Sequence, residues 1–169
     1  MARLRHPNIV VIHDIINVNE TIAISMDWVD GRTLASLLRT LPDRTHADDM
    51  ELLRVTLGTK AEDSSHFADT PHRHFALLVR DIARATQVVH DNHLLHLDIK
   101  PSNVLVRRDG TPLLADFGVT RDIRLETSYT RTFAGTPVYA APEQLRRNDK
   151  KIGPHTDVYT DVRPSLHTH

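Results

Sequence analysis

HLDIKPSNVL, residues 96–105, places a histidine, an aspartate, a lysine and an asparagine within eight positions, beside a short apolar run. Aspartate and asparagine are common in ordinary surface turns, so the composition of the stretch alone does not make it a functional loop. Its position is more informative, because helical periodicity precedes it and a strand-like run follows it. A polar loop held between two rigid elements is well placed to fix side chains for binding or catalysis.

The local patterns around this loop predict an α+β chain. Two β-branched runs indicate a pair of antiparallel strands joined by a short turn. Apolar residues at helical spacing predict a short helix and then a helix of about five turns. Asp109-Gly110 between two apolar runs is a strong hairpin signal. The predicted elements are strands at 8–16 and 21–29, a short helix at 30–41, a polar insertion at 42–72 with a helical piece around 48–57, a long helix at 73–93, and a hairpin at 103–118.

Composition limits the classes of protein that fit. The chain has 169 residues, of which 40% are apolar and 25% charged, and its formal net charge is -1, so neither nucleic acid nor a membrane surface is an expected partner. It contains no cysteine, which excludes disulfides and thiolate zinc sites. Its apolar runs are too short to span a bilayer, so we expect no membrane segment and a cytoplasmic protein. The composition does not indicate an oligomeric state.

Three motifs identify a family. His96-Leu97-Asp98-Ile99-Lys100-Pro101-Ser102-Asn103 is followed by Asp116-Phe117-Gly118 and then by Ala141-Pro142-Glu143. In this order and spacing they resemble a eukaryotic-type serine/threonine protein kinase, over about residues 4–159. The resemblance implies a truncated kinase-like fold: a small-lobe remnant at 1–26, a hinge at 27–31, a partial large lobe at 32–162 that includes the polar insertion, and a non-family tail at 163–169.

The resemblance also implies phosphoryl transfer from ATP to serine or threonine of a protein substrate. Asp98 would orient the substrate hydroxyl and accept its proton, and Lys100 would face the γ-phosphate. Asn103 and Asp116 would bind Mg²⁺ through oxygen, which this hard cation prefers. Thr136 matches the family position that bonds the catalytic aspartate and lysine.

Further positions acquire roles by the same resemblance. For ATP, Asp27, Trp28 and Val29 would offer backbone groups to adenine, Met26 would guard the pocket behind it, and Leu105 would form part of its apolar floor. Other positions would be structural. His96 would pack beneath Phe117 with Ile12 nearby, and Asp157 would anchor the backbone of the catalytic loop.

Departures from the family pattern limit the predicted activity. No glycine precedes Gly31, so the Gly-rich loop is missing, and so are the strand lysine that grips the phosphates and its glutamate partner. Pro164 would end the last helix early, and the arginine that Glu143 would need is absent, so we expect Glu143 to lack an ionic partner. Leu97 replaces the arginine that contacts a phosphorylated activation segment, for which Thr130 and Thr132 are candidate acceptors. The isolated chain is therefore expected to be inactive. A catalytically dead binding module and a non-functional gene fragment are the alternatives.

Overall fold

The computed structural model describes residues 4–18, 21–40, 71–117, 120–122, 136–146 and 149–161. The described strands are β1 (Ile12–Val18), β2 (Thr21–Met26), β3 (Gly31–Thr33), β4 (Leu94–Leu95), β5 (Val104–Arg107), β6 (Pro112–Leu114) and β7 (Arg121–Asp122). The helices are α1 (Leu34–Thr40), α3 (Pro71–Asp91), α4 (Pro142–Leu145) and α5 (Pro154–Asp161), with short 3₁₀ turns η1 (Pro101–Asn103) and η2 (Asp149–Lys151). The chain is thus a mixed α/β structure, as predicted.

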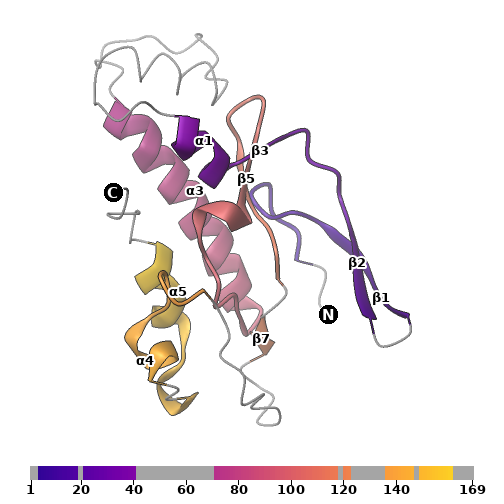
Figure 1. Cartoon of the computed structure of the whole chain (residues 1–169), viewed down its shortest axis with the longest axis vertical. Coiled ribbons are helices and arrows are strands. Elements are labelled where there is room, and N and C mark those ends of the chain that lie inside the picture. Colours follow the sequence, from indigo (N-terminus) through magenta and orange to yellow (C-terminus); the bar gives the residue numbers. More distant parts are fainter. Residues whose placement is uncertain are drawn as a thin grey trace.

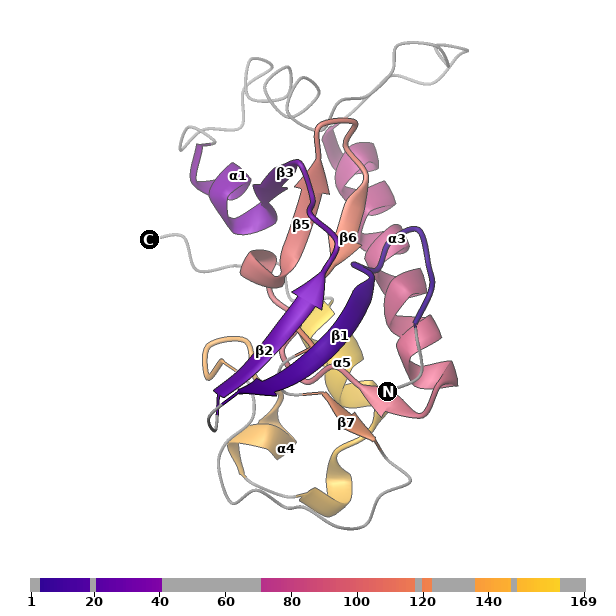
Figure 2. The same cartoon turned by 90° about the vertical axis from the view of Figure 1, so that its right-hand side faces the viewer.

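Three small antiparallel sheets carry the strands. β1 pairs with β2, β4 with β7, and a three-stranded sheet has the order β3-β5-β6. The segment before β1 lies along the free side of β6, where the Val10 N–H donates to the Leu114 carbonyl and the Leu114 N–H to the Asn8 carbonyl. The β1–β2 hairpin stands apart from the three-stranded sheet in Figure 1. Figure 2 shows β5 and β6 lying in front of the long helix α3.

The main core lies between α3 and the three-stranded sheet. α3 turns its buried side toward β6, and its apolar positions recur three and four residues apart, as the sequence pattern predicted. The buried residues of this cluster are Ile9, Leu34, Leu37, Leu78, Ile82, Ala85, Val89, Ile99, Val104, Val106, Leu114 and Phe117. Because Val104 and Ile99 belong to this core, the loop that begins at His96 is fixed to it near both ends.

Several predicted boundaries were wrong. β1 begins at Ile12 rather than residue 8, and the predicted helix at 30–41 begins only at Leu34. Residues 31–33 instead form β3, which pairs with β5. The helix begins there because the Thr33 hydroxyl accepts a hydrogen bond from the Ser36 N–H at 3.1 Å, as an N-cap does. α3 begins at Pro71, inside the predicted insertion.

The hairpin at 103–118 is confirmed as β5 and β6, with Gly110 at φ 84° in the turn between them. The helix expected around 48–57, the activation-segment residues Thr130 and Thr132, and the tail at 163–169 lie outside the described residues. Among the described helices, none combines the length and apolar character that crossing a bilayer requires.

Candidate active site

Four of the predicted catalytic residues are in direct contact. Three lie on the loop at 96–105, and Thr136 lies further along the chain. The Lys100 Nζ donates to Asp98 Oδ2 at 2.7 Å and to the Thr136 hydroxyl at 2.6 Å. The Thr136 hydroxyl in turn donates to Asp98 Oδ1 at 2.9 Å. The Asn103 Nδ2 donates to Asp98 Oδ2 at 3.1 Å and to the Asp98 backbone carbonyl at 2.9 Å. We call Asp98, Lys100, Asn103 and Thr136 the Asp98 network.

The Asp98 network is largely shielded from solvent but not fully buried. The Asp98 side chain is 11% exposed and that of Lys100 is 19% exposed, so their ion pair is only partly solvated. Partial burial strengthens such a charged pair relative to one in water. Three side chains hold the two Asp98 oxygens from sequence positions up to 38 residues apart. The carboxylate therefore has a fixed orientation.

Buried groups beneath the loop fix its backbone. The fully buried Asp157 accepts hydrogen bonds from the His96 N–H at 2.9 Å and the Leu97 N–H at 2.7 Å, which confirms its predicted anchoring role. Leu97 has φ 64°, a left-handed conformation that is uncommon for a leucine. Asp157 thus stabilises a strained turn one residue before Asp98.

His96 lies under the loop as expected. Its ring packs against Phe117 with centroids 4.9 Å apart, and its Nε2 lies 3.1 Å from the Ala115 carbonyl. Burial lowers the pKa of His96, although Asp157, the Ala115 carbonyl, Asp98 and Asp116 act in the opposite direction. The ring is therefore neutral, with its proton on Nε2, where it can donate to Ala115. Ile12 packs against the same core cluster as Phe117.

Two residues in this region make contacts that were not anticipated from the sequence. The His90 Nε2 lies 2.8 Å from Asp157 Oδ2, which joins α3 to the loop anchor. The buried Gln144 donates to the Leu97 carbonyl at 2.9 Å and accepts from the Ala141 N–H at 2.9 Å. Helical periodicity could not predict the contacts of His90 or Gln144, because it indicates which face of a helix a side chain lies on but not which residue that side chain will contact.

The prediction that Glu143 lacks a partner was wrong. Its Oε1 accepts a hydrogen bond from the Thr156 hydroxyl at 2.8 Å and lies 3.5 Å from the His155 Nε2. Burial acts to raise the pKa of Glu143, but its own backbone N–H, Thr156, His155 and Arg146 outweigh burial and lower it. The chain therefore stabilises the charged form of this carboxylate through Thr156 and His155 of α5 and through Arg146.

The expected magnesium ligands are close in the chain fold. The Ala115 N–H donates to the Asn103 carbonyl at 2.9 Å. Asp116 is therefore the neighbour, in the chain, of a residue that is hydrogen-bonded to Asn103. Asp116 has φ 62° and is exposed, whereas Asn103 is buried. Within the described part of the chain, no group of three or more His, Cys, Asp or Glu side chains is arranged to hold a metal ion. Any cation here would need further oxygen ligands from its substrate.

The expected adenine residues fall into two groups. Val29 and Leu105 pack on one small apolar cluster with Val10, Leu113 and Ala115. Met26 and Trp28 are instead exposed, Trp28 by 92%. The Asp27 N–H donates to the Val11 carbonyl at 2.9 Å, and the Asp27 carboxylate lies 2.8 Å from the His13 Nε2.

This fold and loop are those of a protein kinase. The protein kinase domain family matches residues 1–161, and the chain belongs to that family. Its relatives include the human serine/threonine-protein kinase Nek2, 32% identical over 87% of this chain, and the serine/threonine-protein kinase PknF of Mycobacterium tuberculosis, 33% identical over 98% of this chain. A third is the serine/threonine-protein kinase PkaA of Streptomyces coelicolor, 34% identical over 85%.

The chain is thus a member of the serine/threonine group of protein kinases. It spans 30%, 31% and 22% of the lengths of these three relatives.

Proposed function

We propose that this chain carries the acceptor side of a phosphoryl-transfer site, which moves the γ-phosphoryl group of ATP to a serine or threonine hydroxyl of a protein. One observation carries the proposal: both carboxylate oxygens of Asp98 are held by the Asp98 network. Phosphoryl transfer depends mainly on positioning and on charge stabilisation, and an oriented carboxylate beside a lysine supplies both.

The bonds of Asp98 indicate where the substrate enters. A carboxylate has about four lone-pair sites. Oδ2 accepts from Lys100 and Asn103, whereas Oδ1 accepts from Thr136 alone. Oδ1 therefore retains a site for the incoming hydroxyl. The hydroxyl oxygen bonds to the γ-phosphorus as its proton passes to Asp98, and the bond to the bridging oxygen breaks, so that ADP leaves with the electron pair. Lys100 stabilises the negative charge of the transferring group.

The segment after β2 is the proposed adenine site. Val29 and Leu105 share an apolar cluster, which suits the face of a planar base. Because the Asp27 N–H is already bonded to Val11, we assign the polar contacts of the base to the Asp27 carbonyl and the Val29 N–H. Met26 would lie behind the base, and Trp28, being exposed, at its open edge.

The donor set also fits Mg²⁺. The Asn103 nitrogen is turned to Asp98, so its Oδ1, which has a long contact of 3.4 Å with the Ser102 hydroxyl, remains for a cation. Asp116 adds a carboxylate, and Mg²⁺ is commonly held by one or two such groups together with substrate phosphates. When bound, the ion would neutralise phosphate charge.

The groups expected to grip the α- and β-phosphates are not supplied by the first 30 residues of this chain, which hold neither glycine nor lysine. We therefore propose, in place of the complete inactivity expected from the sequence, that the 169-residue chain transfers phosphate only slowly by itself. Loss of a single cationic clamp costs related enzymes about 10³-fold or more.

The test compares the purified chain with Asp98→Asn and with the exposed control Asp91→Asn. ATP, MgCl₂ and a serine peptide are supplied, and phosphopeptide is quantified by mass spectrometry, with an alanine peptide as blank. We expect Asp98→Asn to lower the rate by about 10²- to 10⁴-fold and the control to leave it unchanged. Fluorescence of Trp28, the only tryptophan, reports nucleotide binding separately. Binding without transfer by the unmodified chain would instead identify a binding module, and equal rates for both variants would contradict the role of Asp98.

A further inference from the structure

We infer that the cavity at the end of the β3–β5 pair is a docking site for an extended acidic segment of a protein partner. The cavity has a volume of about 410 Å³ and is lined by Asp30, Gly31, Arg32, Leu37, Val106, Arg107 and Arg108. None of these residues belongs to the Asp98 network or to the proposed magnesium site, and only Asp30 lies in the segment after β2 that also forms the proposed adenine site. The inference therefore does not rest on phosphoryl transfer.

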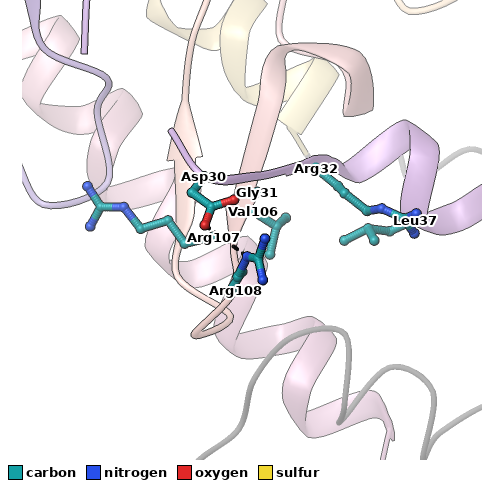
Figure 3. A pocket seen from close by; sticks show the side chains of 7 residues that line it. All are labelled: Asp30, Gly31, Arg32, Leu37, Val106, Arg107 and Arg108. Carbon is teal, nitrogen blue, oxygen red and sulfur yellow. Dashed lines mark ion pairs between the residues drawn. The ribbon is translucent and has the colours of Figure 1, made fainter. Parts of the chain in front are cut away.

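Backbone geometry places the arginines at separate points along the cavity. In the β3–β5 register, Arg32 lies opposite Val106 and Gly31 opposite Arg107. Since successive residues of a strand point to opposite faces, Arg32 and Arg107 leave the pair on different sides. Figure 3 shows these two side chains extending in opposite directions, with Asp30 and Arg108 between them. The result is a strip of three guanidinium groups rather than a single cluster.

The strip has an excess of positive charge. Three arginines face one aspartate, in a chain whose net charge is -1. Asp30 pairs with Arg108 at 2.9 Å, and both side chains are mostly exposed, so this ion pair is weak and an incoming anion can compete with Asp30 for Arg108. Within the described residues, Arg32 and Arg107 form no ion pair. They are therefore available to an anion.

The neighbouring hairpin turn carries one acidic residue, Asp109, which does not line the cavity. The Thr111 N–H and hydroxyl lower the pKa of Asp109, and Arg107 contributes in the same direction. The Asp109 carboxylate is thus satisfied mainly by its own turn, through a 2.9 Å bond from the Thr111 N–H. Because its carboxylate stays ionised, Asp109 offsets part of the charge of Arg107, and the strip with its turn carries three arginines against two aspartates.

The spacing of the charges favours an extended peptide as the ligand. A single phosphate would engage only one of these arginines, whereas successive acidic side chains of an extended chain point to opposite sides and can reach Arg32 on one side and Arg107 on the other. The buried side chains of Leu37 and Val106 provide an apolar base for a residue between them. Carboxylate and phosphate groups share this chemistry, so the acidic side chains can be glutamates or phosphoserines.

The test measures fluorescence anisotropy of a labelled eight-residue peptide with three consecutive glutamates, titrated with the full chain. A phosphoserine version and a lysine version are run in parallel. We expect the acidic peptides to bind and Arg32→Gln/Arg107→Gln to weaken binding by about 5- to 30-fold, from two exposed charge contacts. Arg84→Gln, on the exposed side of α3, is the matched control and should bind as the unmodified chain does.

Higher salt should weaken binding of the acidic peptides, because the arginines are exposed. Whichever acidic peptide binds more tightly identifies carboxylate or phosphate as the preferred group. The reversed variant Arg32→Glu/Arg107→Glu should prefer the lysine peptide. Equal binding by the double glutamine variant and the control, or equal affinity for a single-stranded oligonucleotide or for vesicles of anionic lipid, would overturn the inference of a peptide-docking site.

Discussion

The His96 side chain illustrates how burial sets a protonation state at the scale of one residue. Its Nε2 faces a carbonyl oxygen, and its Nδ1 accepts a 3.4 Å contact from the Asp98 N–H. A second ring proton would remove that acceptor and place a charge in the core. The lowered pKa of His96 therefore reflects a site built for the neutral ring, which supports the backbone of Asp98 without exchanging protons.

The same feature predicts how stability depends on pH. In the unfolded chain His96 regains an ordinary pKa of about 6.5. Below that pH the unfolded state binds a proton that folded His96 does not, so the free energy of unfolding falls as the pH drops. The loss is at most about 1.4 kcal/mol per pH unit for this one group. The free energy of unfolding can be measured by urea denaturation at several pH values between about 7.5 and 5.5. It should fall less steeply with decreasing pH in His96→Gln than in the unmodified chain.

The control for that comparison is His93→Asn, because His93 is exposed and asparagine tolerates its left-handed backbone, φ 59°. This variant should keep the full slope. If His96→Gln does not fold, NMR of the imidazole rings in the unmodified chain replaces it. A His96 ring that takes up a proton at or above pH 6.5 would contradict the neutral assignment.

At the scale of elements, local patterns were predicted and long-range pairings were not. The β5–β6 hairpin and α3 follow from Asp109-Gly110 and from helical spacing, both of which act between near neighbours. β3 was read as part of a helix, because its three residues pair with β5, more than 70 positions away. Gly31–Thr33 is a strand only because it pairs with β5, and the sequence of these three residues does not indicate that partner.

The pairing of β3 with β5 requires a residue without a side chain at position 31. A Cβ atom at this position would overlap the carbonyl group of Val106, which is backbone and cannot swing aside. We expect Gly31→Ala to push β3 from β5 and to lower the free energy of unfolding by about 1–3 kcal/mol, as overpacking does. Chemical denaturation measures this change.

Gly153→Ala is the matched control for Gly31→Ala. Its Cβ would meet only the ring of His155, at 3.1 Å, and that side chain is 68% exposed and free to move. The control should change stability much less. Equal losses in the two variants would show that the close approach of β3 and β5 is not what requires Gly31.

Asp157 links three elements, because it lies on α5, pairs with His90 of α3 and holds the backbone before Asp98. Asp157→Asn replaces one acceptor oxygen with a donor and removes a buried charge that the bonds require. We expect a loss of about 2–4 kcal/mol of stability and faster hydrogen exchange at the His96 and Leu97 amides. Asp91→Asn, exposed at the end of α3, should change neither quantity. Unchanged exchange in Asp157→Asn would show that the loop holds its shape without this anchor.

At the scale of the whole molecule, motifs predicted residues that lie together around Asp98 and two of their supports, Asp157 and His96, but not every contact of the supporting residues. Asp98, Lys100, Asn103 and Thr136 were named from the family resemblance, and the structure brings them together. The family pattern also suggested that Glu143 would stand alone, but Thr156 and His155 accompany it. A motif fixes the residues that the chemistry needs, whereas a compensating contact depends on which side chains the fold happens to place nearby.

The distribution of apolar surface leads to a prediction about association. α5 buries Thr156, Asp157 and Thr160, while Val158 on the same helix is 50% exposed and Leu145 of α4 is 53% exposed. Figure 1 shows α4 and α5 close together at one end of the molecule. A helix that buries polar groups and exposes apolar ones presents a surface that water disfavours.

We therefore expect the chain to self-associate as its concentration rises, through the exposed apolar side chains of Leu145 and Val158. In sedimentation velocity, Leu145→Lys/Val158→Lys should remain monomeric at concentrations where the unmodified chain forms larger species. Ala83→Lys, a charge added on the exposed side of α3, is the control and should associate as before. If the double variant associates as strongly as the control, contacts elsewhere hold the copies together, and the exposed side of α5 does not drive association.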